Sequence, residues 1–192
     1  RVGQAVGTVL MEDKGSRPTV VIGKDTRISS DMLESALMAG LCSVGSDVKP
    51  VGTIPTPAVA YLTVQEKADA GIVISASHNP YEHNGIKVFS GQGYKLSDSV
   101  EARIEEKILS DAPMKHRTRE RIGRRHHGMR QLKRDYIDFV ASTIESDLAG
   151  LKILADCANG AASATAPELF GRFKARTDFI HRDPDGVNIN SH

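Results

Sequence analysis

The sequence contains no tryptophan, only two cysteines and few aromatic residues. Cys42 and Cys157 stand far apart and outside the paired spacing of a zinc or redox motif, so they predict free thiols in a reducing compartment. No apolar run approaches the roughly 18 residues of a membrane-spanning helix. The first residues also lack the charged, apolar and small-residue order of a signal peptide. We therefore expect a cytoplasmic protein that does not bind a membrane.

The chain also lacks an excess of charge of either sign. Its 25 basic and 24 acidic residues leave a net charge of +1, which gives no strong field to attract nucleic acid. Nine Lys or Arg and three His do gather in residues 115–134, but without interleaved aromatics or a nucleic-acid-binding motif. We interpret this basic stretch as a solvated connecting segment or edge strand. Nucleic-acid binding through it is the alternative, and it predicts steeply salt-dependent affinity.

The length predicts more than one domain. At 192 residues the chain exceeds the ~100 to 150 residues of a typical domain, which predicts one full domain and part of another. Because it begins at Arg1 within a helical pattern and stops at His192 after an unfinished loop, we expect a piece of a longer protein. We place the first domain at residues 1–132 and the truncated start of the second at residues 133–192.

Apolar runs alternate with amphipathic stretches along the first domain. This alternation predicts right-handed crossovers, and so an α/β fold with a mixed, largely parallel sheet flanked by helices. Asp98 and Glu101 stand at the spacing of a capping box, which indicates the start of one helix. Strands are predicted at residues 19–22, 47–51, 70–74 and 86–89. Helices are predicted at residues 2–10, 31–44 and 98–109, and a further helix follows the loop at residues 52–57 and ends at about residue 65.

A second unit of the same kind follows. Residues 133–147 have the apolar spacing of a helix that leads out of the first domain. Residues 151–156 then predict a strand, with Asn159–Gly160 as the turn before a helix. Residues 177–192 supply at most one more strand and a loop. We therefore expect the truncated start of a second, similar domain.

Three polar loops follow predicted strands, at residues 24–29, 52–57 and 75–85. In such folds the functional loops lie beyond the carboxyl ends of the strands. Ser77 lies in the third loop, where a ligand can reach its hydroxyl while the sheet fixes the backbone. The surrounding sequence, SASHNPYEHNGIK, is rich in small and turn-forming residues, which let the backbone approach a bulky anion.

Two kinds of chemistry use a serine in this setting. A hydrolase pair of Ser77 and His78 is disfavoured, because the serine is outside a Gly-x-Ser-x-Gly elbow and no obvious acid orients the imidazole. Phosphoryl transfer needs an acceptor atom, cations that neutralise phosphate oxygens, and a group that moves a proton. Lys24, Arg27, His78 and Lys87 are the candidate cations, and Lys87 or His78 is the candidate for proton transfer.

Four segments of the sequence together resemble a known family. They read GKDTRISSDMLESAL, GTIPTPAVAYLT, ADAGIVISASHNPYEHNGIK and DCANGAAS. This set is similar to the α-D-phosphohexomutase superfamily, and within it to the bacterial phosphoglucosamine mutases. The resemblance covers about residues 1–111 and 136–190, and SASHNP followed by NGIK is its most specific part.

By this resemblance, Ser77 is a phosphoserine that passes its phosphoryl group to a hydroxyl of a sugar phosphate. The implied reaction interconverts glucosamine 6-phosphate and glucosamine 1-phosphate through a bisphosphate, on the route to UDP-N-acetylglucosamine and cell-wall precursors. The resemblance also implies one Mg²⁺ per site, held by a phosphate oxygen on Ser77 and by carboxylates of an Asp-rich loop. A hexose or hexosamine 1,6-bisphosphate is the implied activator, and a homodimer is the implied assembly.

The resemblance implies roles for three further residues. Lys87, the lysine of NGIK, matches the general acid or base, and His78 and Arg27 match active-site positions near the phosphate. Lys24 and Asn79 are expected to bind phosphate or substrate. Arg27, His78 and Lys87 each have a purely structural interpretation as well: Arg27 pairs with a nearby aspartate at the surface, His78 caps the loop, and Lys87 is a solvent-exposed strand residue.

The sequence also departs from the family pattern. The family's Thr-Asp-Gly-Ile-Arg-Gly segment and its Asp-Gly-Asp-x-Asp-Arg metal loop do not occur in these 192 residues, and Glu82–His83 stands where an aspartate is common. We therefore expect a phosphate donor without a complete enzyme, inactive by itself. A phosphomannomutase or phosphoglucomutase would share the same site residues, and a non-catalytic phosphate-binding module is the alternative of another class.

Overall fold

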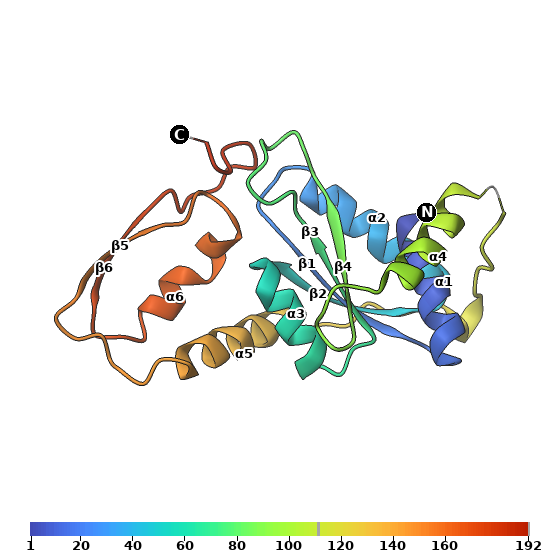
Figure 1. The fold of residues 1–192 in the computed structure, drawn as a ribbon, viewed down its shortest axis with the longest axis horizontal. Helices are drawn as coiled ribbons and strands as arrows, with labels where there is room; N and C mark the ends of the chain where they lie inside the picture. The colour runs from blue at the N-terminus through green and yellow to red at the C-terminus, as the bar shows by residue number, and fades with distance from the viewer. Residues whose placement is uncertain (111, 192) are drawn as a thin grey trace.

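The computed structural model describes residues 1–110 and 112–191, so Asp111 and His192, which fall within the expected ranges, lie outside the described residues. Figure 1 shows two sheets with helices around them. The elements are α1 (Val2–Lys14), β1 (Thr19–Lys24), α2 (Ser30–Ser43), β2 (Asp47–Thr53), α3 (Thr56–Gln65), β3 (Ala70–Ile74), β4 (Ile86–Ser90), α4 (Asp98–Leu109), η1 (Arg119–Arg121), α5 (Met129–Ser142), β5 (Lys152–Asp156), η2 (Ala161–Ala164), α6 (Ala166–Phe170) and β6 (Arg176–Ile180).

The larger sheet has the strand order β2–β1–β3–β4. β1 pairs in parallel with β2 and with β3, whereas β4 is antiparallel to β3. Every residue of β3 is buried, because helices cover both faces of the sheet, and such strands read as continuous apolar runs. The structure thus confirms the predicted mixed, largely parallel sheet.

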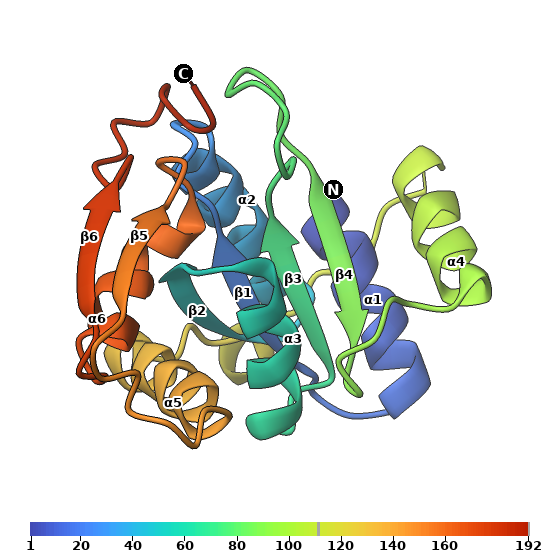
Figure 2. The same ribbon diagram turned by 60° about the vertical axis from the view of Figure 1, so that its left-hand side comes forward.

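Helices lie on both faces of the larger sheet (Figure 2). An apolar cluster packs between the sheet and the helices on each face. On one face, α1, α2 and α4 enclose a cluster that includes Val6, Ile22 and Leu41. On the other face, α3 and α5 enclose a cluster that includes Val59 and Leu132. Full burial of one such side chain contributes about 1.5–3 kcal/mol. The clusters therefore fix the strands whose carboxyl ends carry the candidate loops.

The predicted capping box at the start of α4 is wrong. The N-cap is Ser97, whose side chain makes no capping hydrogen bond, and Asp98 and Glu101 lie within the first turn. Both carboxylates instead pair with Lys95, at 3.8 and 3.0 Å from its Nζ. The acids remain favourable at this helix end because they face the positive end of the helix dipole.

Helix α5 begins four residues earlier than predicted and ends five residues earlier, at Met129–Ser142 rather than at residues 133–147. Its start follows Gly128, whose φ of 130° is unfavourable for residues with a side chain. At the end, the Thr143 hydroxyl donates to the Val140 carbonyl at 2.7 Å. The N-cap of α5 is Gly128 rather than a Ser, Thr, Asp or Asn, which explains why the start of the helix was predicted wrongly.

Part of the basic stretch runs along β2. The Val48 N–H donates to the Arg124 carbonyl, and the His126 N–H donates to the Val48 carbonyl, both at 2.8 Å. The Arg124 N–H also donates to Asp47 Oδ1 at 2.8 Å, and His126 Nε2 lies 3.2 Å from Asp47 Oδ2. Burial alone would raise the pKa of Asp47, but these hydrogen bonds and the nearby charge of Arg17 lower it below its ordinary value. The stretch therefore borders the sheet, as a connecting or edge segment would.

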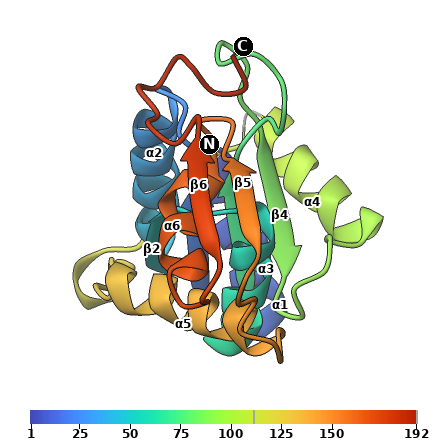
Figure 3. The same cartoon turned by 90° about the vertical axis from the view of Figure 1, so that its left-hand side faces the viewer.

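The second sheet pairs β5 and β6 in parallel, with η2 and α6 between them in the chain. Figure 3 shows these two strands side by side, with α6 and α5 next to them. α5 packs against both α6 and β2, so it connects the two sheets. Within residues 1–110 and 112–191, no helix has the length and apolar character needed to cross a membrane.

Candidate functional site

A cavity of about 280 Å³ lies where the loop between β3 and β4 meets the second part of the chain. The views in Figures 1 and 2 agree that this loop and the C-terminal segment lie next to each other beyond the carboxyl end of β3. Its walls come from segments far apart in the sequence. Two are the loops that follow β1 and β3, and two are the segments that follow β5 and β6. The lining residues are Asp25, Ser75, Ser77, His78, Ala158, Gly160, Ala161, Ile189 and Asn190.

Ser77 is an exposed residue in this wall with an unusual backbone conformation. Its φ is 58°, in the left-handed region that costs a residue with a side chain roughly 1–2 kcal/mol. The Ser77 N–H donates to Ser75 Oγ at 3.1 Å, and the Ser75 N–H donates to the Gly85 carbonyl at 2.9 Å. Ser75 is buried, so these bonds tie the strained residue to the end of β3. The hydroxyl of Ser77 is left at the cavity.

Arg27 lies beneath the loop. It is 2% exposed and pairs through Nη1 with Asp25 Oδ2. Its Nη2 donates to the Ser77 carbonyl at 3.2 Å and to the Asn79 carbonyl at 2.6 Å. The pair with Asp25 is therefore buried, in contrast to the surface pair that the structural interpretation of Arg27 assumed. In this geometry the guanidinium holds the backbone on both sides of His78.

His78 and Asn79 continue the loop after Ser77. His78 Nδ1 lies 3.4 Å from Ser77 Oγ, within reach of a weak hydrogen bond. Among the described residues, no carboxylate is within hydrogen-bonding distance of the His78 ring, so the third group of a hydrolytic triad is missing there. Asn79 is exposed, and its carbonyl is the group that Arg27 holds.

The two candidate lysines lie outside the cavity wall. Lys87 lies opposite Val73 in the antiparallel pair of β3 and β4, next to the end of β3, and its side chain is exposed. Lys24 ends β1, but its Nζ pairs with Asp31 and lies 3.2 Å from Glu34 Oε2, both on α2. The structure thus brings Ser77 together with its own loop neighbours, while the Lys24 ammonium is directed to the carboxylates of α2.

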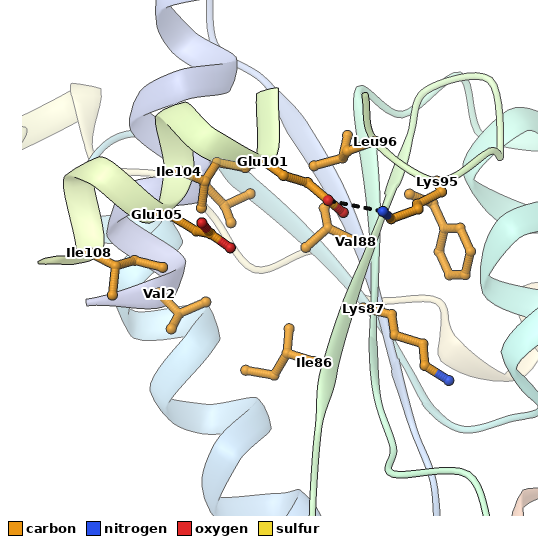
Figure 4. A pocket seen from close by; sticks show the side chains of 12 residues that line it. Val2, Ile86, Lys87, Val88, Lys95, Leu96, Glu101, Ile104, Glu105 and Ile108 are labelled. Atoms are coloured by element: carbon orange, nitrogen blue, oxygen red, sulfur yellow. Dashed lines mark ion pairs between the residues drawn. The ribbon is translucent and has the colours of Figure 1, made fainter. Parts of the chain in front are cut away.

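A larger cavity, of about 670 Å³, lies between β4, α1 and α4. Its walls are mainly aliphatic, from residues such as Ile86, Val88 and Ile104, and its charged groups include the ion pair of Lys95 and Glu101 (Figure 4). The side chain of Lys87 leaves β4 on the side opposite to Ile86 and Val88. Ser77 and His78 therefore line the smaller cavity, whereas Lys87 is among the residues that line the larger one.

The segment around Asn159 forms the opposite wall, and sequence reasoning did not assign it to the site. Ala158 and Asn159 have φ of 49° and 47°, and the Thr26 hydroxyl donates to the Asn159 carbonyl at 2.6 Å. The available signal was the position of this turn after β5, which repeats the position of the Ser77 loop after β3. Burial, and then the negative charge of Asp156, raises the pKa of the neighbouring Cys157, which favours the protonated thiol over the reactive thiolate.

Comparisons with known proteins agree on one family. The family model for the α/β/α domain I of phosphoglucomutase/phosphomannomutase matches residues 1–114. Proteins named phosphoglucosamine mutase from Acetivibrio thermocellus and Clostridium botulinum (strain Langeland) are 52% identical over 191 residues and 51% identical over 193 residues. Each alignment covers 99% of this chain but 42% of the relative, so the chain spans less than half the length of these proteins.

Solved structures give the same result. A phosphoglucomutase/phosphomannomutase family protein from Burkholderia thailandensis has a TM-score of 0.81 at 26% identity, over 100% of this chain and 41% of that one. A structure titled putative phosphomannomutase, from Thermus thermophilus, has a TM-score of 0.79 at 23% identity, over 97% of this chain and 42% of that one. The second likeness concerns the fold alone.

Proposed function

Because the chain belongs to the phosphoglucomutase/phosphomannomutase family, we propose that it carries the phosphoryl-donor site of a phosphoglucosamine mutase. In this proposal the whole protein is an isomerase that interconverts glucosamine 6-phosphate and glucosamine 1-phosphate. Ser77 stores the phosphoryl group between turnovers. The amino-sugar substrate is inferred from the names of relatives about half identical in sequence to this chain.

The observation that carries this proposal is the placement of Ser77. It is an exposed serine in a left-handed conformation, at the edge of a cavity beyond a buried strand. Backbone strain of this size persists only where surrounding contacts fix it, and it is often found at functional sites. Arg27 and Ser75 supply such contacts. The hydroxyl is thereby presented to a ligand by a backbone that is held from below.

The proposed transfer uses few groups. The bond between phosphorus and Ser77 Oγ breaks while a sugar hydroxyl forms a new bond to phosphorus, and the hydroxyl proton passes to a general base. The electron pair of the broken bond stays on Ser77 Oγ, which takes up a proton and becomes a hydroxyl again. Lys87 is proposed as that base, and as the acid in the return step, because it is exposed on β4 beside the end of β3. His78, 3.4 Å from Ser77 Oγ, is proposed to donate a hydrogen bond to a phosphate oxygen.

The other predicted residues take supporting roles in this proposal. Arg27 fixes the loop through two carbonyls and acts on the phosphate through that backbone. Asn79 places one of these carbonyls, and its exposed side chain is proposed to contact substrate. Lys24 would reach a phosphate only by leaving Asp31 and Glu34. We therefore assign Lys24 a weaker, long-range contribution.

The described residues do not by themselves fit a Mg²⁺ site. Among residues 1–110 and 112–191, no three or more His, Cys, Asp or Glu side chains gather closely enough to hold a metal ion. Asp25 is the carboxylate in the cavity wall, and it already pairs with Arg27. The Mg²⁺ that the family resemblance implies would need ligands other than these, so no step above depends on it.

The test of the proposal is covalent labelling of Ser77. Full-length protein is incubated with glucosamine 1,6-bisphosphate and Mg²⁺, and intact-mass and peptide analysis are expected to find one phosphoryl group on Ser77. The Ser77→Ala variant should take up none and lose turnover. Ser99→Ala, which alters an exposed serine of α4, should behave as wild type. An unlabelled Ser77 in an otherwise folded protein would favour the phosphate-binding module instead.

The identity of the sugar needs a separate measurement. One solved structure similar to this chain carries the words putative phosphomannomutase in its title, and enzymes of that kind would share Ser77 and Lys87. Comparing kcat/KM for the 1-phosphates of glucosamine, glucose and mannose decides between them. We expect the glucosamine compound to be preferred. Preference for mannose or glucose with normal labelling of Ser77 would keep the chemistry and change the substrate.

A further inference from the structure

Three consecutive carbonyl groups begin at the left-handed turn of Ser77, and each accepts a hydrogen bond from a side chain outside the loop. Arg27 binds the carbonyls of Ser77 and Asn79. The carbonyl between them, that of His78, accepts a hydrogen bond from Nδ2 of Asn190 at 3.1 Å. Arg27 lies next to β1 in the first sheet, whereas Asn190 lies beyond β6. The Ser77 loop is therefore held both by a residue beside the first sheet and by a residue that follows the second sheet.

Asn190 is itself held firmly. Its N–H donates to the Ala158 carbonyl at 2.8 Å, and its φ is 50°, a left-handed conformation that asparagine tolerates well. Its neighbour Ile189 is 7% exposed and anchors the segment in the interior. The segment before it is also fixed, because Asn188 Nδ2 donates to the Asp183 carbonyl at 3.1 Å. The amide that reaches His78 thus extends from a rigid support.

Asn190 and His78 also line two cavities next to the loop. One is the cavity of about 280 Å³ that contains Ser77, and the other is a cavity of about 270 Å³ next to Tyr81 and Glu82. Both cavities are lined by His78, Ile189 and Asn190. Losing the bond would leave the His78 carbonyl without the donor that holds it between these cavities.

We propose that Asn190 is a positioning residue for Ser77, which it holds in its reactive place through the carbonyl of His78. The inference rests on the proposed function, in which Ser77 carries the phosphoryl group. Asn190 does not contact the reacting atoms. Its effect on turnover comes from the backbone of the residue that follows Ser77, and a small displacement of a reacting group is enough to lower a rate strongly.

The test uses two variants of the full-length protein that keep the left-handed backbone. Asn190→Asp keeps the size of the side chain but removes the donor, because a carboxylate accepts hydrogen bonds only. Asn190→Gly removes the whole side chain and adopts a positive φ without strain. Alanine is avoided, because it would add backbone strain at φ 50°. Ser191→Ala is the matched control, since it alters the adjacent exposed side chain and leaves the amide in place.

Two readouts separate positioning from general stability. Both variants are expected to lower kcat by about tenfold while KM stays within about twofold of wild type. Hydrogen exchange should become faster in peptides covering residues 76–84 and stay unchanged in β1 and β3. Wild-type kcat in both variants, or unchanged exchange in residues 76–84, would overturn the inference. If the wild-type protein itself shows neither turnover nor labelled Ser77, the proposed function fails, and the exchange measurement still decides whether Asn190 holds the loop.

Discussion

Replacing Arg27 by methionine is predicted to destabilise the protein mainly by leaving Asp25 without its partner. Asp25 is 4% exposed, and in the variant its carboxylate would keep only the Ser30 hydroxyl, at 3.0 Å, and the N–H of residue 27, at 3.1 Å. Removing one partner of a buried ion pair typically costs about 3–5 kcal/mol. The two lost bonds to the loop carbonyls add less, because Ser77 and Asn79 are exposed and water can replace the donor.

The total expected loss for Arg27→Met is therefore about 4 kcal/mol, a large share of the roughly 5–15 kcal/mol that usually stabilises a domain. It is measured by urea denaturation at neutral pH. The double variant Asp25→Asn/Arg27→Met tests the cause, since asparagine keeps an oxygen for the Ser30 hydroxyl and carries no charge. The double variant should regain about 2 kcal/mol or more relative to Arg27→Met alone.

Labelling of Ser77 separates the two roles of Arg27. In the double variant the buried charge is gone, but the loop carbonyls still lack their donor, so phosphorylation of Ser77 should stay slow although stability recovers. A loss below about 1 kcal/mol in Arg27→Met would refute the buried-pair argument. Normal labelling kinetics in the stable double variant would refute the argument that Arg27 positions the loop.

Two further predictions concern Lys87 and Asp47. Lys87→Arg keeps the positive charge, but arginine does not release its proton at working pH, so turnover should fall by about 100-fold or more. Labelling of Ser77 from the bisphosphate should slow as well, because Lys87 is the proposed acid of that step. Lys95→Arg is the control, and wild-type turnover would remove Lys87 from proton transfer. Asp47 has a lowered pKa in the fold, so its contribution to stability is present above the ordinary carboxylate pKa and is lost as the pH falls through the lowered value. Asp47→Asn should therefore be less stable than wild type at neutral pH and lose less stability on acidification, and equal pH dependence of urea unfolding in the two proteins would contradict this.

The sheet was readable from the sequence because its central strands are buried on both faces. Every residue of β3 and most residues of β1 are buried, so each strand appears as an uninterrupted apolar run. The ends of helices were harder to predict where no capping residue marks them. The start of α5 depends on the positive φ of Gly128, and the apolar spacing of the helix does not reveal it.

The site was only half readable for a related reason. Ser77 follows directly from its place after β3, because loop position along a strand is a local property. The contact of Ser77 with Arg27 spans 50 residues of sequence, and the contact of His78 with Asn190 spans 112. Such contacts depend on how distant segments pack in the folded chain, which local sequence patterns do not show. The sequence also does not show whether Arg27 is buried or exposed, because Asp25, two residues away, could form an ion pair with it in either position.

The charges around Ser77 indicate which state of the site the described residues balance. At the end of β1, Lys24 is paired with two carboxylates of α2, and in the loop that follows, Arg27 is paired with Asp25, so both cations already have partners. A phosphoryl group on Ser77 adds a charge of about −1.5 to −2. His78 Nδ1 lies 3.4 Å from Ser77 Oγ, and Lys87 is exposed on β4 opposite Val73; among residues 1–110 and 112–191, neither forms an ion pair with a carboxylate. The described residues thus balance the unphosphorylated loop, and the phosphorylated loop requires further positive charge.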